Sequence, residues 1–248
     1  MALTAGHNLL SPRYITLTVN SMTLASVTAV LAVLLALLLS YAARIERSRL
    51  TLAVNRIAGM GYAIPGSIIA VGILIPLAAF DNAVSAWMED NFGIRTGLLL
   101  TGSIFALVFA YLVRFMAAAL HTVQSSLEKI TPHMEETARA LGHGPVSTGL
   151  RIHAPILTGG MLTAGLIVFV DVMKELPATL IMRPFNFDTL AVQAYNLAKD
   201  ERLAQAATPS LVIVACGLLP ILIMSRAIMR SRPGAAKRPR ARTLQTAT

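Results

Sequence analysis

The sequence is poor in charged residues and has almost no cysteine. Charged residues make up 13% of its 248 residues, against roughly 25% in ordinary soluble domains, while hydrophobic residues make up 55% and the mean hydropathy is +0.66. The single cysteine, Cys216, lies within an apolar run, so the chain cannot form an intramolecular disulfide. This composition excludes an ordinary soluble domain and indicates a membrane protein.

Motifs of enzyme active sites are also missing from the sequence. There is no glycine-rich phosphate loop followed by Lys and Ser or Thr, no nucleophile elbow and no metal-binding His-Glu pair. The 5 histidines lie in flanks and loops without the spacing of metal ligands. We therefore expect a chain that is not an enzyme, with no catalytic residue, no bound metal, no cofactor and no ATP site of its own.

Long apolar runs are what the sequence has in abundance. A transmembrane helix needs about 20 consecutive apolar residues, and none of the runs shows the strict alternation that is typical of a membrane β-strand. The sequence therefore predicts an all-α, polytopic membrane helical bundle with about five transmembrane helices. The predicted spans are 22–43, 57–80, 96–120, 155–182 and 203–225.

Lys and Arg are unevenly distributed among the segments that flank these spans, and an excess of them marks the cytoplasmic side. This topology explains the net charge of +9 better than nucleic-acid binding does. It predicts a multi-pass protein of the cell inner (plasma) membrane, with the N-terminus outside and the C-terminus in the cytoplasm. The basic residues assigned to the cytoplasm are Arg44, Arg47, Arg49, Arg56, Lys129, Arg139, Arg151, Arg226, Arg230, Arg232, Lys237, Arg238, Arg240 and Arg242, and those assigned outside are Arg13, Arg95, Arg183, Lys199 and Arg202.

The chain is predicted to have three parts. Residues 1–20 form an external N-terminal segment, residues 21–226 form the transmembrane domain, and residues 227–248 form a disordered basic cytoplasmic tail that contacts anionic lipid. An odd number of spans after an external N-terminus without a signal peptide is unusual. We therefore expect that a preceding helix, or a whole preceding half, belongs to the protein but is missing from this chain.

The segment between the third and fourth spans, residues 126–155, has the signals of two short helices joined by a sharp turn. The Thr-Pro pair at 131–132 favours a helix start, and Gly142 stands where a left-handed terminating residue is expected. The Gly-Pro pair at 144–145 ends this helix and favours the start of the next. The apolar residues that share one face of the first helix are Met134, Ala138 and Leu141.

At these residues the sequence resembles the permeases of type I binding-protein-dependent ABC importers (MetI-like). Their cytoplasmic loop has the pattern Glu-Ala-Ala, three residues, Gly, nine residues, then Ile, two residues and Pro. The matching residues are Glu136, Thr137, Ala138, Gly142, Ile152 and Pro155, with Thr137 in place of the middle alanine. The resemblance implies that this loop forms coupling helices that seat in a groove of an ABC ATPase subunit, which binds the ATP. It also implies a solute-binding protein and a second permease half or a homodimer as partners.

Two further segments are similar to the ferric-iron branch of these permeases. They are Lys-Glu-Leu-Pro-Ala-Thr at 174–179 and Arg-Pro-Phe-Asn-Phe-Asp-Thr-Leu-Ala at 183–191. That branch commonly fuses two homologous halves, and this chain resembles the C-terminal half without its first helix. The resemblance implies import of ferric iron, with thiamine, polyamines and sulfate as alternative solutes.

Two other classes of protein remain open. One is an ion-coupled secondary transporter, in which broken helices and buried charges serve ion coupling. The other is a membrane-embedded structural subunit without a solute path. The spaced pattern from Glu136 to Pro155 favours the permease over the secondary transporter, which has no reason to carry it. In a structural subunit, the charged residues from Asp171 to Glu175 would be only a packing device.

Charged residues interrupt two of the predicted spans. Asp171, Lys174 and Glu175 are spaced by three and four, so they share one face of a continuous helix, about 24 to 30 Å from the start of the span. They either line the translocation path, where carboxylates suit a cation such as Fe(III), or have a structural role as an ion pair or near the outer interface. Arg114, about 9 Å from the predicted cytoplasmic end of its span, is expected to extend toward that surface.

Overall fold

The computed structural model describes residues 11–46 and 48–231, and this part of the chain contains helices and no strand. The all-α prediction is confirmed. Five of the described helices are long and apolar enough to cross a membrane, as predicted. The elements are α1 (Pro12–Ile45), α2 (Arg49–Ala58), a 3-10 turn (Gly61–Ala63), α3 (Gly66–Phe92), α4 (Ile104–Leu127), α5 (Pro132–Ala140), α6 (Pro145–Thr148), a π-helical turn (Gly149–His153), α7 (Ala154–Met173), α8 (Pro177–Met182), α9 (Leu190–Lys199) and α10 (Leu203–Ser231).

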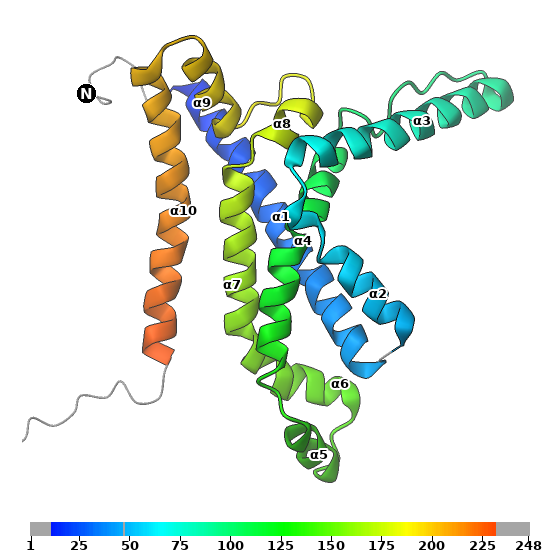
Figure 1. Ribbon diagram of the computed structural model, residues 1–248, viewed down its shortest axis with the longest axis vertical. Coiled ribbons are helices and arrows are strands. Elements are labelled where there is room, and N and C mark those ends of the chain that lie inside the picture. Colours follow the sequence, from blue (N-terminus) through cyan, green and yellow to red (C-terminus); the bar gives the residue numbers. More distant parts are fainter. Residues whose placement is uncertain (1–10, 47, 232–248) are drawn as a thin grey trace, which may run out of the picture.

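The centre of the fold is a bundle of α1, α4 and α7, which pack pairwise along their lengths (Figure 1). Helix α10 stands beside α7 and makes most of its contacts with α9 at one end of the bundle. Small α1 residues at 25, 29, 32 and 36 are buried at spacings of four and three, which lets the neighbouring backbones approach. A Cβ on Gly160 of α7 would overlap the Ser126 hydroxyl of α4, so these two helices are also in close contact.

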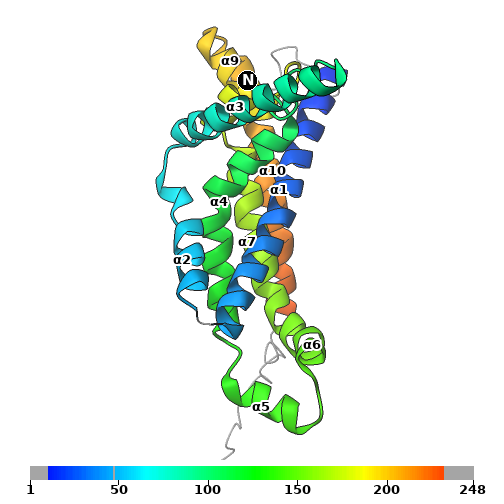
Figure 2. The same ribbon diagram turned by 90° about the vertical axis from the view of Figure 1, so that its right-hand side faces the viewer.

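The second predicted span, 57–80, is wrong as a single kinked helix. Helix α2 ends at Ala58, a 3-10 turn follows, and Pro65 keeps the residue before it extended, so that α3 begins only at Gly66. The turn lies directly on α4, because a Cβ on Gly61 would overlap the carbonyl oxygen of Val113. Helix α3 then leaves the bundle at a steep angle (Figures 1 and 2).

The fourth predicted span, 155–182, is wrong at its far end. Helix α7 ends at Met173, and a new helix begins at Pro177 after a short non-helical stretch. Proline lacks the N–H that would bond to the carbonyl of Met173, and its ring clashes with that carbonyl. The charged residues of this region therefore lie at a helix break rather than along one continuous helix.

Both ends of the described chain are more helical than predicted. Helix α1 already begins at Pro12, inside the segment 1–20, and its polar residues fit because the hydroxyls of Thr16 and Thr18 donate to the carbonyls four residues earlier, at 2.9 Å each. At the other end α10 continues to Ser231, so residues 227–231 are helical rather than disordered. The remainder of the predicted tail, 232–248, lies outside the described residues.

Candidate functional site

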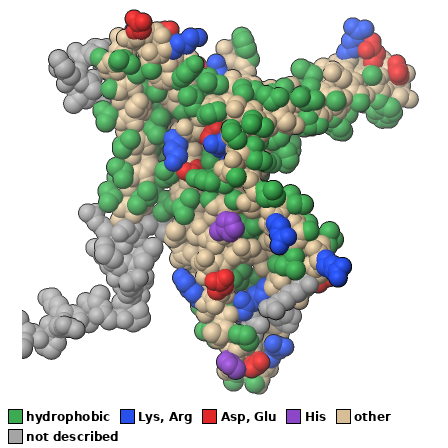
Figure 3. Space-filling model, in the orientation of Figure 1, with side chains coloured by type: hydrophobic (Ala, Val, Ile, Leu, Met, Phe, Trp, Pro, Cys, Tyr) green, Lys and Arg blue, Asp and Glu red, His purple; other side chains and the backbone are tan. Residues whose placement is uncertain are grey.

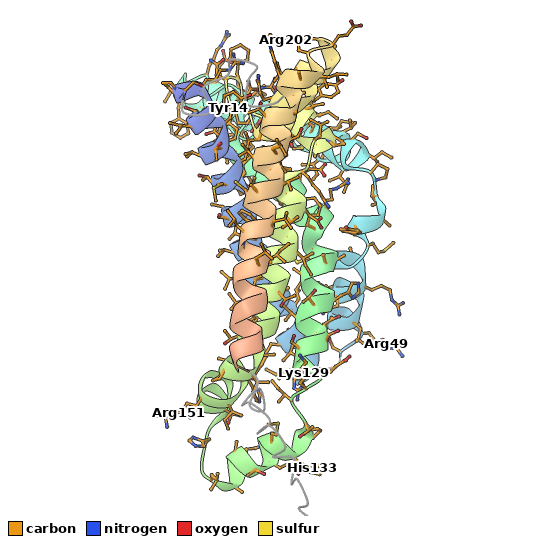
Figure 4. All side chains as sticks on the ribbon, turned by 90° about the vertical axis from the view of Figure 1, so that its left-hand side faces the viewer. Tyr14, Arg49, Lys129, His133, Arg151 and Arg202 are labelled. Carbon is orange, nitrogen blue, oxygen red and sulfur yellow. The ribbon has the colours of Figure 1, made fainter. Side chains whose placement is uncertain are left out.

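The segment 126–155 projects beyond one end of the bundle, opposite to the end that carries α8 and α9 (Figures 1 and 2). It contains the two short helices that the sequence predicts, with α5 beginning at Pro132 and α6 at Pro145. Thr131 is the N-cap residue of α5, but its side chain makes no capping hydrogen bond. In Figure 4, His133 lies near the far end of this projection, with Lys129 and Arg151 nearer to the bundle.

Helix α5 ends in a left-handed cap, as predicted for Gly142. The φ angle of Gly142 is 81°, its N–H donates to the carbonyl of Arg139 at 3.0 Å, and the N–H of His143 donates to the carbonyl of Ala138 at 3.0 Å. These two bonds satisfy carbonyls that the end of a helix otherwise leaves unpaired. A residue with a Cβ is strained in this conformation, so the sharp turn after α5 depends on glycine.

One side of α5 carries a shallow groove of about 310 Å³. Met134, Ala138 and Leu141 line it, which confirms that these residues share a face. Ile152 lines the same groove from the π-helical turn, so the isoleucine of the sequence pattern faces the groove together with α5. Ala138 is only 1% exposed whereas Leu141 is 74% exposed, so the groove has a packed floor and an open apolar rim.

The remaining residues of the pattern face solvent. Glu136 is exposed and pairs with the ring nitrogen Nδ1 of His133, one turn earlier, at 3.3 Å. The Thr137 hydroxyl donates to the carbonyl of His133 at 2.7 Å, so threonine satisfies its polar group within the helix where the family pattern has alanine. Pro155 is the second residue of α7 and marks the start of the span, as predicted.

A second group of polar side chains lies at the break between α7 and α8. Glu175 is 5% exposed, and its Oε2 accepts from Arg114 Nε of α4 at 3.1 Å. Its other oxygen, Oε1, accepts from the N–H of Ala178 at 3.2 Å, while Arg114 Nη1 donates to the carbonyl of Ile64 at 3.2 Å. A Cβ on Gly66 would overlap this pair. The pair therefore joins α4, the α7–α8 break and the segment before α3.

This geometry corrects the prediction that Arg114 extends to the cytoplasmic surface. The prediction placed the end of the span at residue 120, but α4 continues to Leu127, so Arg114 lies about 20 Å from that end. A guanidinium this far inside an apolar helix needs a carboxylate partner, and Glu175 is that partner.

Asp171 and Lys174, at the end of α7 just before the break, form a separate ion pair at 2.9 Å. The Asp171 side chain is 9% exposed and that of Lys174 is 63% exposed, and the hydroxyl of Tyr62 approaches Asp171 Oδ2 at 3.5 Å. Because both residues belong to the end of α7, this pair does not lock two helices together. Charged side chains also gather at the outer tip of α3 and around the projecting loop (Figure 3).

Two buried hydroxyls, those of Thr179 and Tyr111, also lie at the α7–α8 break, and together with the two ion pairs they form what we call the junction. The sequence predictions gave neither hydroxyl a role. Thr179 donates its proton to the carbonyl of Glu175 at 2.5 Å, so the Tyr111 hydroxyl donates to Thr179 Oγ1 at 2.7 Å. Tyr111 is 1% exposed and its ring packs near that of Phe115. A tyrosine inside an apolar span was the available signal, because a buried hydroxyl requires a partner.

No group of three His, Cys, Asp or Glu side chains that could hold a metal ion occurs in the described part of the chain. Asp171 and Glu175 each face a cation, Lys174 and Arg114 respectively. The junction therefore has balanced charge, and its carboxylate oxygens are already engaged.

Comparison with known proteins identifies similar permeases. No family model matches the chain. It is 27% identical to the Fe(3+)-transport system permease protein FbpB 2 of Haemophilus influenzae over 84% of this chain and 38% of that protein. It is also 27% identical to the putative 2-aminoethylphosphonate transport system permease protein PhnV of Salmonella typhimurium, over 54% of this chain and 50% of that protein. The chain thus spans half or less of the length of these curated relatives.

Solved structures give the class of the fold. A bacterial ABC transporter involved in the import of the acidic polysaccharide alginate has a chain with a TM-score of 0.68 at 15% identity, covering 93% of this chain and 86% of that one. The MetNI methionine ABC transporter, in an inward-facing conformation, has one with a TM-score of 0.63 at 17% identity, covering 89% and 99%. The chain therefore has the fold of the type I ABC importer permeases, and in sequence it resembles the ferric-iron permeases among them.

The buried pair at the junction gives a prediction about stability. Glu175→Gln should lower the free energy of unfolding by about 3 kcal/mol, because it leaves the mostly buried guanidinium of Arg114 without a carboxylate. The matched control is Glu89→Gln, which removes an exposed pair with Arg95 and should cost less than about 1 kcal/mol. Denaturant unfolding in detergent micelles measures both, and equal losses in the two variants would contradict the assignment.

Proposed function

We propose that this chain is the permease component of an ATP-driven ABC importer in the cell inner membrane. The observation that carries the proposal is the projecting loop 126–155, in which a glycine-terminated helix presents an apolar groove and an exposed Glu136 away from the bundle. An element of this form suits docking of a helix into a groove of a partner. The fold supports the same function, since the similar solved chains belong to ABC transporters.

The partners follow from this assignment. A separate ATPase would receive α5 and α6 and would supply the ATP site, while a solute-binding protein would approach the opposite end of the bundle, near α8 and α9. The solved alginate transporter was captured with a substrate-bound periplasmic protein, which supports such a partner here. A second permease half or a second copy of this chain would complete the pathway.

Ferric iron is the solute that we propose. The support is the 27% identity to the Fe(3+) permease over 84% of the chain. The phosphonate permease has the same identity over only 54%, and a spermidine/putrescine permease homologue covers 86% at a lower identity of 21%. Within the proposed path, Asp171 and Lys174 would line the solute-facing side, because Lys174 and Tyr62 are largely exposed. Glu175 would act differently, since its burial against Arg114 suits a residue that holds the helix break in place.

Gly142 provides the test of the coupling assignment. In Gly142→Ala the added methyl group meets nothing within 4 Å. The substitution therefore raises the free energy of the folded loop by about 1 to 2 kcal/mol only because alanine is strained in the left-handed conformation. We expect association with the ATPase to weaken about fivefold to thirtyfold and solute-stimulated hydrolysis to fall accordingly. Insertion into the membrane should not change, because no apolar run is altered.

Gly144→Ala is the matched control for this experiment. Its added methyl group also meets nothing within 4 Å, and Gly144 does not have a positive φ angle. If Gly142→Ala associates with the ATPase and supports hydrolysis as well as Gly144→Ala does, the loop has no coupling role.

The solute is tested by transport into vesicles that contain the permease, its ATPase and its binding protein. Radioactive Fe(III) should accumulate in an ATP-dependent manner, and 2-aminoethylphosphonate, spermidine, thiamine and sulfate should not compete. Asp171→Asn should reduce uptake severalfold by disturbing the pair with Lys174 at the path, while the complex still assembles. ATP-dependent uptake of one of the competing solutes instead of iron would identify that solute and overturn the iron assignment.

A further inference from the structure

The C-terminal end of α1 contacts the projecting loop at the place where the loop begins. Arg44 donates from Nη1 to the carbonyl of Leu127 at 3.0 Å and from Nη2 to the carbonyl of Ile130 at 2.7 Å. These carbonyls belong to the last residue of α4 and to the turn that follows it, where a helix lacks internal hydrogen-bond partners. A cation at this position also interacts favourably with the negative end of the helix dipole. The start of the loop is thereby fixed to α1.

The same end of α1 contacts the place where the loop returns to the bundle. The Tyr41 hydroxyl shares a hydrogen bond of 2.6 Å with Nδ1 of His153, and the two rings lie 5.8 Å apart. His153 is 3% exposed and Tyr41 is half-buried, so the histidine side of this bond is shielded from water. Tyr41 and Arg44 are three residues apart and therefore share one face of α1. One face of one helical turn holds both ends of the loop.

The backbone at this second contact is unusual. Residues Gly149–His153 form a π-helical turn that joins α6 to α7, and such turns are rare and frequently occur at functional sites. The Tyr41 hydroxyl lies across the turn, since a Cβ on Gly149 would lie 3.4 Å from it. The Tyr41 hydroxyl, which belongs to α1, therefore lies close to both the first and the last residue of the π-helical turn, Gly149 and His153.

We propose that Tyr41 is a positioning residue for coupling between the ATPase and the membrane domain, an inference that rests on the proposed function. The loop is covalently continuous with α4 and α7, so a force on α5 and α6 reaches those helices directly. Helix α1 is not covalently continuous with the loop and contacts it through side chains. The hydrogen bond between Tyr41 and His153 keeps the π-helical turn in a fixed position against α1, so that movement of the loop displaces α1 together with α7.

The test uses the complete complex of permease, ATPase and binding protein in lipid vesicles. Tyr41→Phe keeps the ring and removes only the hydroxyl, and the control is Thr122→Val in α4, which removes a hydroxyl that donates to the Ala118 carbonyl of its own helix. The quantity measured is the ratio of hydrolysis with solute-loaded binding protein to hydrolysis without it. We expect this ratio to fall about fivefold in Tyr41→Phe, because a hydrogen bond to a buried group contributes about 1 kcal/mol, and to be unchanged in Thr122→Val.

A second pair of variants separates positioning from simple stabilisation. His153→Asn places a polar group close to the position of Nδ1 and should retain more of the ratio than His153→Leu, although both remove the imidazole ring. If Tyr41→Phe has the same ratio as Thr122→Val, or if His153→Asn retains no more of the ratio than His153→Leu, the inference is overturned. Failure of the unmodified chain to associate with any ATPase would instead contradict the proposed function.

Discussion

The hydrocarbon core of a membrane offers no hydrogen-bond partners, so polar backbone groups and charges inside it must be paired within the protein. Two interrupted helices create this problem here, one before Gly66 and one between α7 and α8. The Arg114–Glu175 pair resolves both, because the guanidinium donates to the carbonyl of Ile64 and the carboxylate accepts the N–H of Ala178. Glycine at position 66 leaves the space that the pair occupies. This one interaction ties the starts of α3 and α8 to α4.

At the other end of the bundle, the loop 126–155 stands outside the packed helices but is held firmly at its base. Its two ends are brought together where Gly160 of α7 meets Ser126 of α4, and α1 binds both of them through Arg44 and Tyr41. A rigid base with a projecting, partly apolar helix is suited to transmit a force that a partner applies. The buried charges and the loop thus have separate roles at opposite ends of the bundle. The charges stabilise the helix breaks, and the loop is the proposed docking surface for the partner.

Local features of this fold could be predicted from the sequence, and contacts between distant segments could not. Apolar run length gave the number of spans, and the Gly142 and Pro132 signals gave α5 with its left-handed end. The partner of Arg114 was missed because the spacing rule for residues 171–175 assumed one continuous helix, whereas Pro177 ends α7 early. Tyr41 and His153 are 112 residues apart, and no periodicity in the sequence links them. Such contacts become visible only when the packing of α1 against α7 is known.

Hydrogen–deuterium exchange of the complex tests the central claim most directly, which is that the projecting loop is the surface that the ATPase engages. Helix α5 and the turn around Gly142 are short and lie beyond the bundle, so in the isolated chain their hydrogen bonds should open easily and their amides should exchange quickly. Adding the ATPase should slow exchange in residues 132–152 and leave the amides of α8 and α9 unchanged. Slower exchange at α8 and α9, with the loop unaffected, would contradict the account.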